Sequence, residues 1–118
     1  MKAAFTEKRI FPRINLKLPF RYRIVGSKDV YASRLRDISV GGIGFVSEKF
    51  IPSSTNMRLE IGIPLKIINL MGRVVWSCNL SHSDRYRIGV EFTKISYKDR
   101  CNLADYLNGH LFNLLKKG

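Results

Sequence analysis

The chain of 118 residues is poor in the side chains from which metal, disulfide and catalytic sites are built. It has two histidines, and neither His82 nor His110 lies at metal-ligand spacing from another ligand. Its two cysteines, Cys78 and Cys101, form no CxxC pattern, and we interpret them as reduced, buried thiols. P-loop, GxSxG and HExxH motifs are absent. The sequence therefore predicts no metal, no cofactor and no enzyme activity.

Long apolar runs are also missing. The most apolar stretch, residues 61–76, is interrupted by Pro64, Lys66, Asn69 and Arg73, so it is too polar to span a bilayer. No run of signal-peptide length follows the first charged residues. We therefore expect one cytoplasmic domain with one core and no membrane insertion.

Acidic residues are scarce, nine against 21 lysines and arginines, which gives a formal net charge of +12. The excess is concentrated in residues 1–36, where ten basic residues face two acidic ones; residues 37–118 hold eleven against seven. Such a distribution suits a surface that meets an anion, such as a nucleotide, nucleic acid or acidic headgroups. A solvated face that keeps the protein soluble is the alternative.

Most of the chain shows the two-residue alternation of β-strands that are buried on one face. Six or so short strands, separated by Gly- and Ser-containing turns, predict a small closed or nearly closed barrel. The segments are 16–24, 30–38, 43–46, 57–63, 65–78 as one bent strand or two short ones, and 85–92. The first two segments predict a β-hairpin around the turn at 26–29.

The C-terminal end changes to helical spacing. A capping-box-like start at Ser96 and leucines at 103, 107, 111 and 114 predict a helix over 97–115, weakened at Gly109. We expect the leucine stripe to plug the barrel or pack along it. Alternatively, Phe112 and Leu115 widen the apolar face for a second protomer.

Two clusters can carry binding chemistry. The first is an extended arm, residues 1–14, that holds Arg9 and Arg13 about 13 Å apart along the chain. Each guanidinium can form a bidentate contact with a phosphate or with O6 and N7 of guanine. In a chain with eleven arginines, about one RxxxR pair is expected by chance, so this motif alone is not specific.

The second cluster, Asp37-Ile38-Ser39-Val40-Gly41-Gly42, ends a predicted strand. Asp37 can accept hydrogen bonds from the N1 and N2 donors of guanine, and Ser39 can donate or accept one. Gly42 allows close approach of a ligand to the backbone. The other interpretation is an ordinary Asx or Ser turn whose glycines serve positive φ.

In this order, RxxxR, an alternating hairpin and DxSxxG, the sequence resembles the PilZ family of cyclic di-GMP receptor domains. Residues 72–76 (GRVVW) and 86–92 (YRIGVEF) are similar to later strands of that family, and the likeness covers about residues 7 to 115. It implies a mainly β fold, a six-stranded antiparallel barrel with a C-terminal α-helix over 15–118, preceded by a flexible basic arm, 1–14.

The resemblance also implies a site. Arg9 and Arg13 would hold the guanines and phosphates of cyclic di-GMP, Asp37 and Ser39 would recognise a guanine edge, and Gly42 would permit close approach. Four further candidates are weaker: Lys8, Arg36, Gly41 and Trp76. Many relatives have arginine at the position of Lys8, and a lysine cannot form the bidentate contact of a guanidinium. Trp76 either stacks on a guanine or packs at the rim of the barrel.

We accordingly expect a receptor without catalytic activity, a monomer or weak homodimer, whose arm becomes ordered on ligand binding and so changes contacts with a downstream protein. One alternative is a nucleic-acid-binding barrel that uses aromatics such as Phe20, Tyr22, Tyr31 and Tyr86. The aromatics of the first and last strands fall on apolar faces, which predicts core positions and disfavours nucleic acid as a partner. Another alternative is a PilZ-like adaptor that works through protein contacts alone.

Overall fold

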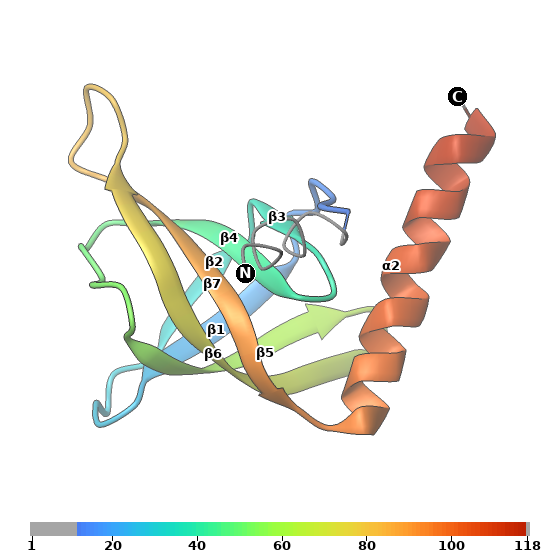
Figure 1. The fold of residues 1–118 in the computed structure, drawn as a ribbon, viewed down its shortest axis with the longest axis horizontal. Helices are drawn as coiled ribbons and strands as arrows, with labels where there is room; N and C mark the ends of the chain where they lie inside the picture. Colours follow the sequence, from blue (N-terminus) through green and yellow to red (C-terminus); the bar gives the residue numbers. More distant parts are fainter. Residues whose placement is uncertain (1–11, 118) are drawn as a thin grey trace, which may run out of the picture.

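The computed structural model describes residues 12–117, which form one antiparallel sheet and one helix (Figure 1). The order of strands across the sheet is β2-β1-β5-β6-β7-β4-β3. The predicted mainly β, antiparallel architecture with a C-terminal helix is therefore confirmed. The elements are β1 Pro19–Ile24, β2 Tyr31–Arg34, β3 Asp37–Ile38, β4 Gly42–Ser47, β5 Asn56–Ile63, β6 Lys66–Asn79, β7 Tyr86–Ile95 and α2 Tyr97–Lys117.

The sheet curls into a half-barrel because its two edge strands, β2 and β3, follow each other in the chain. Leu35 N donates to Leu18 O at 2.8 Å, just before β1, and Arg36 N donates to Gly44 O of β4 at 2.8 Å. Two consecutive residues thus join the ends of the sheet. This crossing divides the segment 30–38, predicted as one strand, into β2 and β3, so the sheet has seven strands where six were expected.

The concave face of the sheet holds the core. Phe20 and Tyr22 are buried, and their rings lie 4.9 and 5.1 Å from the ring of Phe45 on β4. Ile88 and Val90 occupy the corresponding positions on β7. The prediction that the aromatics of the first strand belong to the core is confirmed, so they form no stacking platform for bases.

β6 is one strand of 14 residues, the first of the two forms that the sequence allowed. Its pairing with β7 shifts register between Met71 and Gly72 and again between Val74 and Trp76. A bulge of this kind changes which face a side chain occupies. Val74 is buried in the core, whereas Trp76 is 43% exposed on the convex face.

Helix α2 begins where predicted, because the Ser96 hydroxyl accepts a hydrogen bond from the Asp99 N–H at 3.1 Å. Leu103 and Leu107 are buried, and Lys66 on β6 donates to Asn102 at 2.9 Å. The C-terminal half of the helix stands away from the sheet (Figure 1). The side chains of residues 114–117 lie outside the description, so the proposed protomer contact of Leu115 remains a prediction.

The two cysteines are free, as predicted, but their predicted burial is wrong. Cys78 is exposed and Cys101 is half-buried. Cys78 follows the second register shift of β6 and lies opposite Arg87, on the convex face. Among the described residues, no helix is long and apolar enough to cross a membrane.

Candidate functional site

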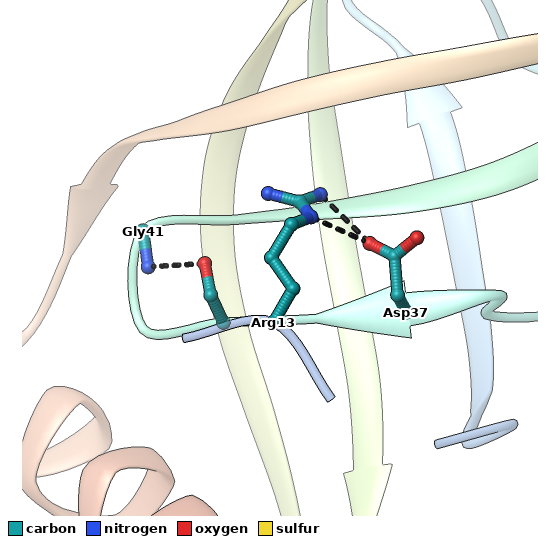
Figure 2. A network of polar contacts seen from close by, with 4 residues as sticks. Arg13, Asp37 and Gly41 are labelled. Atoms are coloured by element: carbon teal, nitrogen blue, oxygen red, sulfur yellow. Dashed lines mark hydrogen bonds and ion pairs between the residues drawn. The ribbon is translucent and has the colours of Figure 1, made fainter. Parts of the chain in front are cut away.

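The described end of the arm is fixed to the second candidate cluster. Ile14 exchanges two backbone hydrogen bonds with Ile38 of β3, at 2.9 and 3.0 Å, and its side chain is buried. Arg13 therefore emerges beside Asp37, 24 positions further along the chain. Arg13 Nε donates to Asp37 Oδ1 at 2.9 Å, and Nη2 lies 2.8 Å from the same oxygen (Figure 2). The structure thus brings one arginine of RxxxR into contact with the aspartate of DxSxxG.

Lys8 and Arg9, the other arm residues expected to bind, lie outside the described residues. Arg36 is exposed, and its backbone N–H bonds Gly44 at the crossing between the sheet edges. Within residues 12–117, its side chain forms no hydrogen bond or ion pair with Asp37, its neighbour in the chain.

The turn between β3 and β4 is held by its own hydrogen bonds. The Ser39 hydroxyl, in a residue only 3% exposed, accepts from Gly41 N–H at 3.1 Å (Figure 2). Ser39 N–H donates to Gly42 O, and Phe92 N–H of β7 donates to Gly41 O, both at 2.9 Å. Ser39 is therefore a turn-forming residue in this state, and ligand contact by Ser39 and Gly41 remains a prediction.

Two glycines of β4 are closely packed. A Cβ on Gly42 would lie 2.3 Å from the Val90 carbonyl oxygen, so this glycine serves the contact between β4 and β7. A Cβ on Gly44 would lie 3.0 Å from both carboxylate oxygens of Asp37. Because Gly44 has no side chain, the Asp37 carboxylate can lie directly over β4. The alternative of an ordinary Ser turn is confirmed by the Ser39–Gly41 hydrogen bond, but its expectation of positive φ at Gly41 and Gly42 is wrong.

Across four strands, Asp37 and Trp76 lie in one row with two glycines between them. Asp37 pairs with Gly44, Gly44 with Gly89 of β7, and Gly89 with Trp76 of β6. We call these four residues the glycine row. Directly paired residues of antiparallel strands point to the same face, and three strand spacings amount to about 14 Å. The row therefore presents a carboxylate at one end and an indole at the other.

Both end residues lean over the glycines. The Asp37 carboxylate covers Gly44, and a Cβ on Gly89 would lie 2.3 to 2.7 Å from three atoms of the Trp76 indole. Gly44 and Gly89 are site residues that the sequence interpretation missed, because only strand register shows that they lie opposite one another. The local signal was a glycine between two apolar core residues of each strand, Gly44 in β4 and Gly89 in β7, on the face away from the core.

Cations flank the glycine row on β6 and β7. The Arg87 guanidinium lies 5.9 Å from the centre of the Trp76 ring, a cation–π distance. On the other side of the row, Arg73 forms an ion pair with Glu91. Together with Arg13, these arginines give the convex face around the row the donors that a phosphate-containing ligand needs. No group of three or more potential metal ligands occurs within residues 12–117.

A family model described as "PilZ domain" matches residues 7–109, well over half of the chain. The chain belongs to the PilZ domain family. The resemblance drawn from the two motifs is thereby confirmed at the level of the family. Among curated proteins, none matches the sequence.

Solved structures share this PilZ fold. The Bacillus subtilis inhibitor of motility (MotI/DgrA) is 21% identical with a TM-score of 0.77, covering 87% of this chain and 51% of that one. The MrkH–c-di-GMP complex of K. pneumonia is 18% identical with a TM-score of 0.70, covering 92% and 53%. The PilZ domain of Escherichia coli YcgR with c-di-GMP is 14% identical with a TM-score of 0.65, covering 92% and 97%.

The chain spans about half the length of the first of these proteins, MotI/DgrA and MrkH. At such identities the likeness establishes the fold. What those proteins bind is a property of their own sites.

Proposed function

We propose that this PilZ domain is a non-catalytic receptor for cyclic di-GMP. The family membership and the two similar solved structures in complex with c-di-GMP support this ligand class. The proposed contacts are those expected from the sequence, with Gly44 and Gly89 added as the positions over which the Asp37 carboxylate and the Trp76 indole lie. The main ligand residues are Arg9, Arg13, Asp37, Ser39 and Gly42; Lys8, Arg36, Gly41 and Trp76 are secondary.

The observation that carries the proposal is the glycine row. A guanine is flat, and its N1 and N2 donors need an acceptor in the plane of the ring. Because Gly44 and Gly89 lack side chains, the Asp37 carboxylate and the Trp76 indole lie close against β4 and β7. The row thus offers a ligand an acceptor at Asp37 and an indole at Trp76 that can stack on a base. Adenine presents no equivalent pair of donors to a carboxylate, so Asp37 favours guanine.

The ion pair between Arg13 and Asp37 suits an exchange of partners. Asp37 Oδ1 accepts both contacts from Arg13, and the Arg13 side chain is 48% exposed. The Asp37 side chain is only 14% exposed, so its carboxylate needs new donors when Arg13 leaves. In the proposed exchange, guanine takes the carboxylate, and the Arg13 guanidinium turns to a phosphate or to the O6 and N7 edge.

We further propose that this exchange orders the arm, residues 1–14, against the sheet. Ile14 is already anchored to Ile38, so contacts from Arg9 and Lys8 would extend an existing attachment point. Ordering would turn a basic segment into a fixed surface for a downstream protein in the cytoplasm. The driving force is the difference in ligand contacts between the two states of the arm.

Isothermal titration calorimetry with cyclic di-GMP tests the proposal. The wild-type chain should bind with micromolar or better affinity, and Arg13→Ala and Asp37→Ala should each weaken binding by about tenfold or more, since charge-assisted contacts contribute about 1.5–3 kcal/mol. Cyclic di-AMP is the matched control ligand. Wild-type protein that gives no heat with cyclic di-GMP, or binds both dinucleotides equally, would refute the proposed site.

A further inference from the structure

The curled sheet leaves an open seam on the side opposite β6. β3 has two residues and covers only Ile43 and Gly44 of β4. Beyond them, the described residues of β4 pair with β7 alone, and those of β2 pair with β1 alone. Beyond the crossing at Arg36, the edges of β2 and β4 are therefore not hydrogen-bonded to each other. Both edges face a cavity of about 530 Å³, which we call the seam cavity.

The floor of the seam cavity is a polar part of the barrel interior. Ser33 of β2 lies opposite Phe20, so both side chains point to the concave face, yet Phe20 is 2% exposed and Ser33 is exposed. Tyr22 and Ser47 also line the cavity. The Tyr31 hydroxyl accepts a hydrogen bond from Lys49 Nζ at 2.7 Å, which places this ammonium at the wall. An interior position of the barrel is thus left uncovered.

The rim of the seam cavity is strongly basic. Five cationic side chains and one carboxylate line it: Lys17, Arg34, Arg36, Lys49 and Arg85, with Glu48. Within the described part of the chain, none of these cations forms an ion pair, whereas Arg13, Arg21 and Arg73 each pair with a carboxylate. Unpaired cations around a cavity favour an anionic occupant.

We propose that the seam cavity receives an acidic, extended segment of a partner protein, which adds as a strand to the free edge of β2. A strand edge offers unpaired N–H and C=O groups to a peptide backbone, and alternate side chains enter the pocket beside it. The four residues of β2 span about 13 Å, enough for a short recognition segment. Carboxylates of the segment would pair with the basic rim.

The seam cavity is distinct from the proposed dinucleotide site. The glycine row lies on the convex face, whereas Ser33 and Ser47 line the seam from the concave side. Arg36 lines the cavity and directly precedes Asp37, so the two sites adjoin at this point. Peptide binding at the seam does not require that cyclic di-GMP be the ligand of the glycine row.

A defined peptide probe tests the proposal on the full chain. The probe is a fluorescein-labelled octapeptide that alternates glutamate and valine, titrated by anisotropy. We expect saturable binding and backbone amide shifts at residues 31–34 and 46–49. Lys49→Glu combined with Arg85→Glu should raise Kd by about tenfold, because two charges that attract the acidic probe then repel it. The matched control, Lys94→Glu with Lys98→Glu, changes the net charge equally outside the cavity and should leave Kd unchanged.

Backbone methylation separates strand addition from charge attraction. Two versions of the probe carry N-methyl groups on alternate amides, and only one set of amides in a strand faces β2. One version should lose binding and the other should keep it. Equal binding by both versions, or no binding of the unmodified probe, would overturn the proposal. Lys49→Gln with Arg85→Gln provides a milder pair of substitutions should the reversed charges disturb folding, and a smaller rise in Kd is then expected.

Two competing ligands test whether the seam cavity binds a small anion or a nucleic acid instead of a peptide. Displacement of the probe by micromolar inorganic pyrophosphate would show a site for small anions, and tighter binding of a thymidine oligonucleotide with loss at higher salt would show a nucleic-acid site. Either result would overturn strand addition. The Arg13→Ala variant should bind the probe as the wild type does, so failure of the dinucleotide proposal and failure of the peptide proposal can be told apart.

Discussion

Asp37 and Trp76 stand at the two ends of one row across β3, β4, β7 and β6, and the two positions between them are glycines. The carboxylate leans over Gly44 and the indole leans over Gly89. A ligand on this face would meet an acceptor at Asp37 and a stacking surface at Trp76. The predictions on ligand binding follow from this arrangement.

Gly44→Ala should weaken cyclic di-GMP binding while leaving the fold intact. The new Cβ would lie 3.0 Å from both Asp37 oxygens, so the carboxylate must move. We expect a loss of affinity of about tenfold, equivalent to about 1.4 kcal/mol, measured by calorimetry. Gly62→Ala is the control, because its Cβ meets Pro19 at 3.3 Å, away from the row. Equal affinities of wild type and Gly44→Ala would contradict the placement of the guanine at Asp37.

Trp76→Ala should weaken binding by about 1–3 kcal/mol, the usual effect of removing an aromatic side chain on which a base stacks. Tyr97→Ala removes another exposed aromatic, on α2, and should have no effect. Because Trp76 is the single tryptophan, its emission in the wild type should change on titration with cyclic di-GMP. An unchanged emission together with unchanged affinity of Trp76→Ala would assign the indole to packing over Gly89.

Tyr22 should make stability depend on alkaline pH. Burial raises the pKa of Tyr22 above its ordinary value of 10.0, against the opposing effect of a hydrogen bond with Ser47. The folded chain therefore holds this proton more tightly than the unfolded chain, and the contribution to stability is present below pH 10 and is lost as the pH rises through the folded-state pKa. Urea unfolding at pH 8 and pH 11 should show a larger fall in the free energy of unfolding for the wild type than for Tyr22→Phe. A fall of the same size in both proteins would argue against this origin.

Gly109→Ala should stabilise the chain. Gly109 is exposed within α2, and a Cβ there would meet no atom within 4 Å. Alanine is favoured over glycine in a helix interior by about 0.5–1 kcal/mol. Thermal unfolding followed by circular dichroism should show a Tm that is higher by a few degrees. Asn108→Gly, on the same exposed part of the helix, should shift Tm in the opposite direction.

The local pattern of the sequence predicted most of the fold but not the outer surface of the sheet. Alternation placed Phe20 and Tyr22 in the core, and Ser96 marked the start of α2. Burial of Cys78 was predicted wrongly, because a strand with a register shift no longer follows a strict period of two. The same shift sets the position of Trp76 opposite Gly89, which no local pattern indicates.

In the candidate site, too, the sequence indicates the residues of the local motifs but not those whose role depends on strand pairing. Asp37, Ser39 and Arg13 were selected from spacing, and the structure brings Arg13 to Asp37. Gly44 and Gly89 were not selected, since their importance depends on pairing between strands that are distant in the chain. Lys8 and Arg9 lie outside the described residues, so their roles stay predictions.

The crossing at Leu35 and Arg36 makes the curl of the sheet a property of the covalent chain as well as of its hydrogen bonds. One residue is bonded to the segment before β1 and the next to β4, and Asp37 follows at once. A cut of the backbone between Leu35 and Arg36 would remove the covalent link at this crossing, and the edges would then be joined there by the hydrogen bonds of Ile14 with Ile38. The carboxylate proposed to sense guanine therefore lies one peptide bond from the point where the sheet is tied into its curved shape.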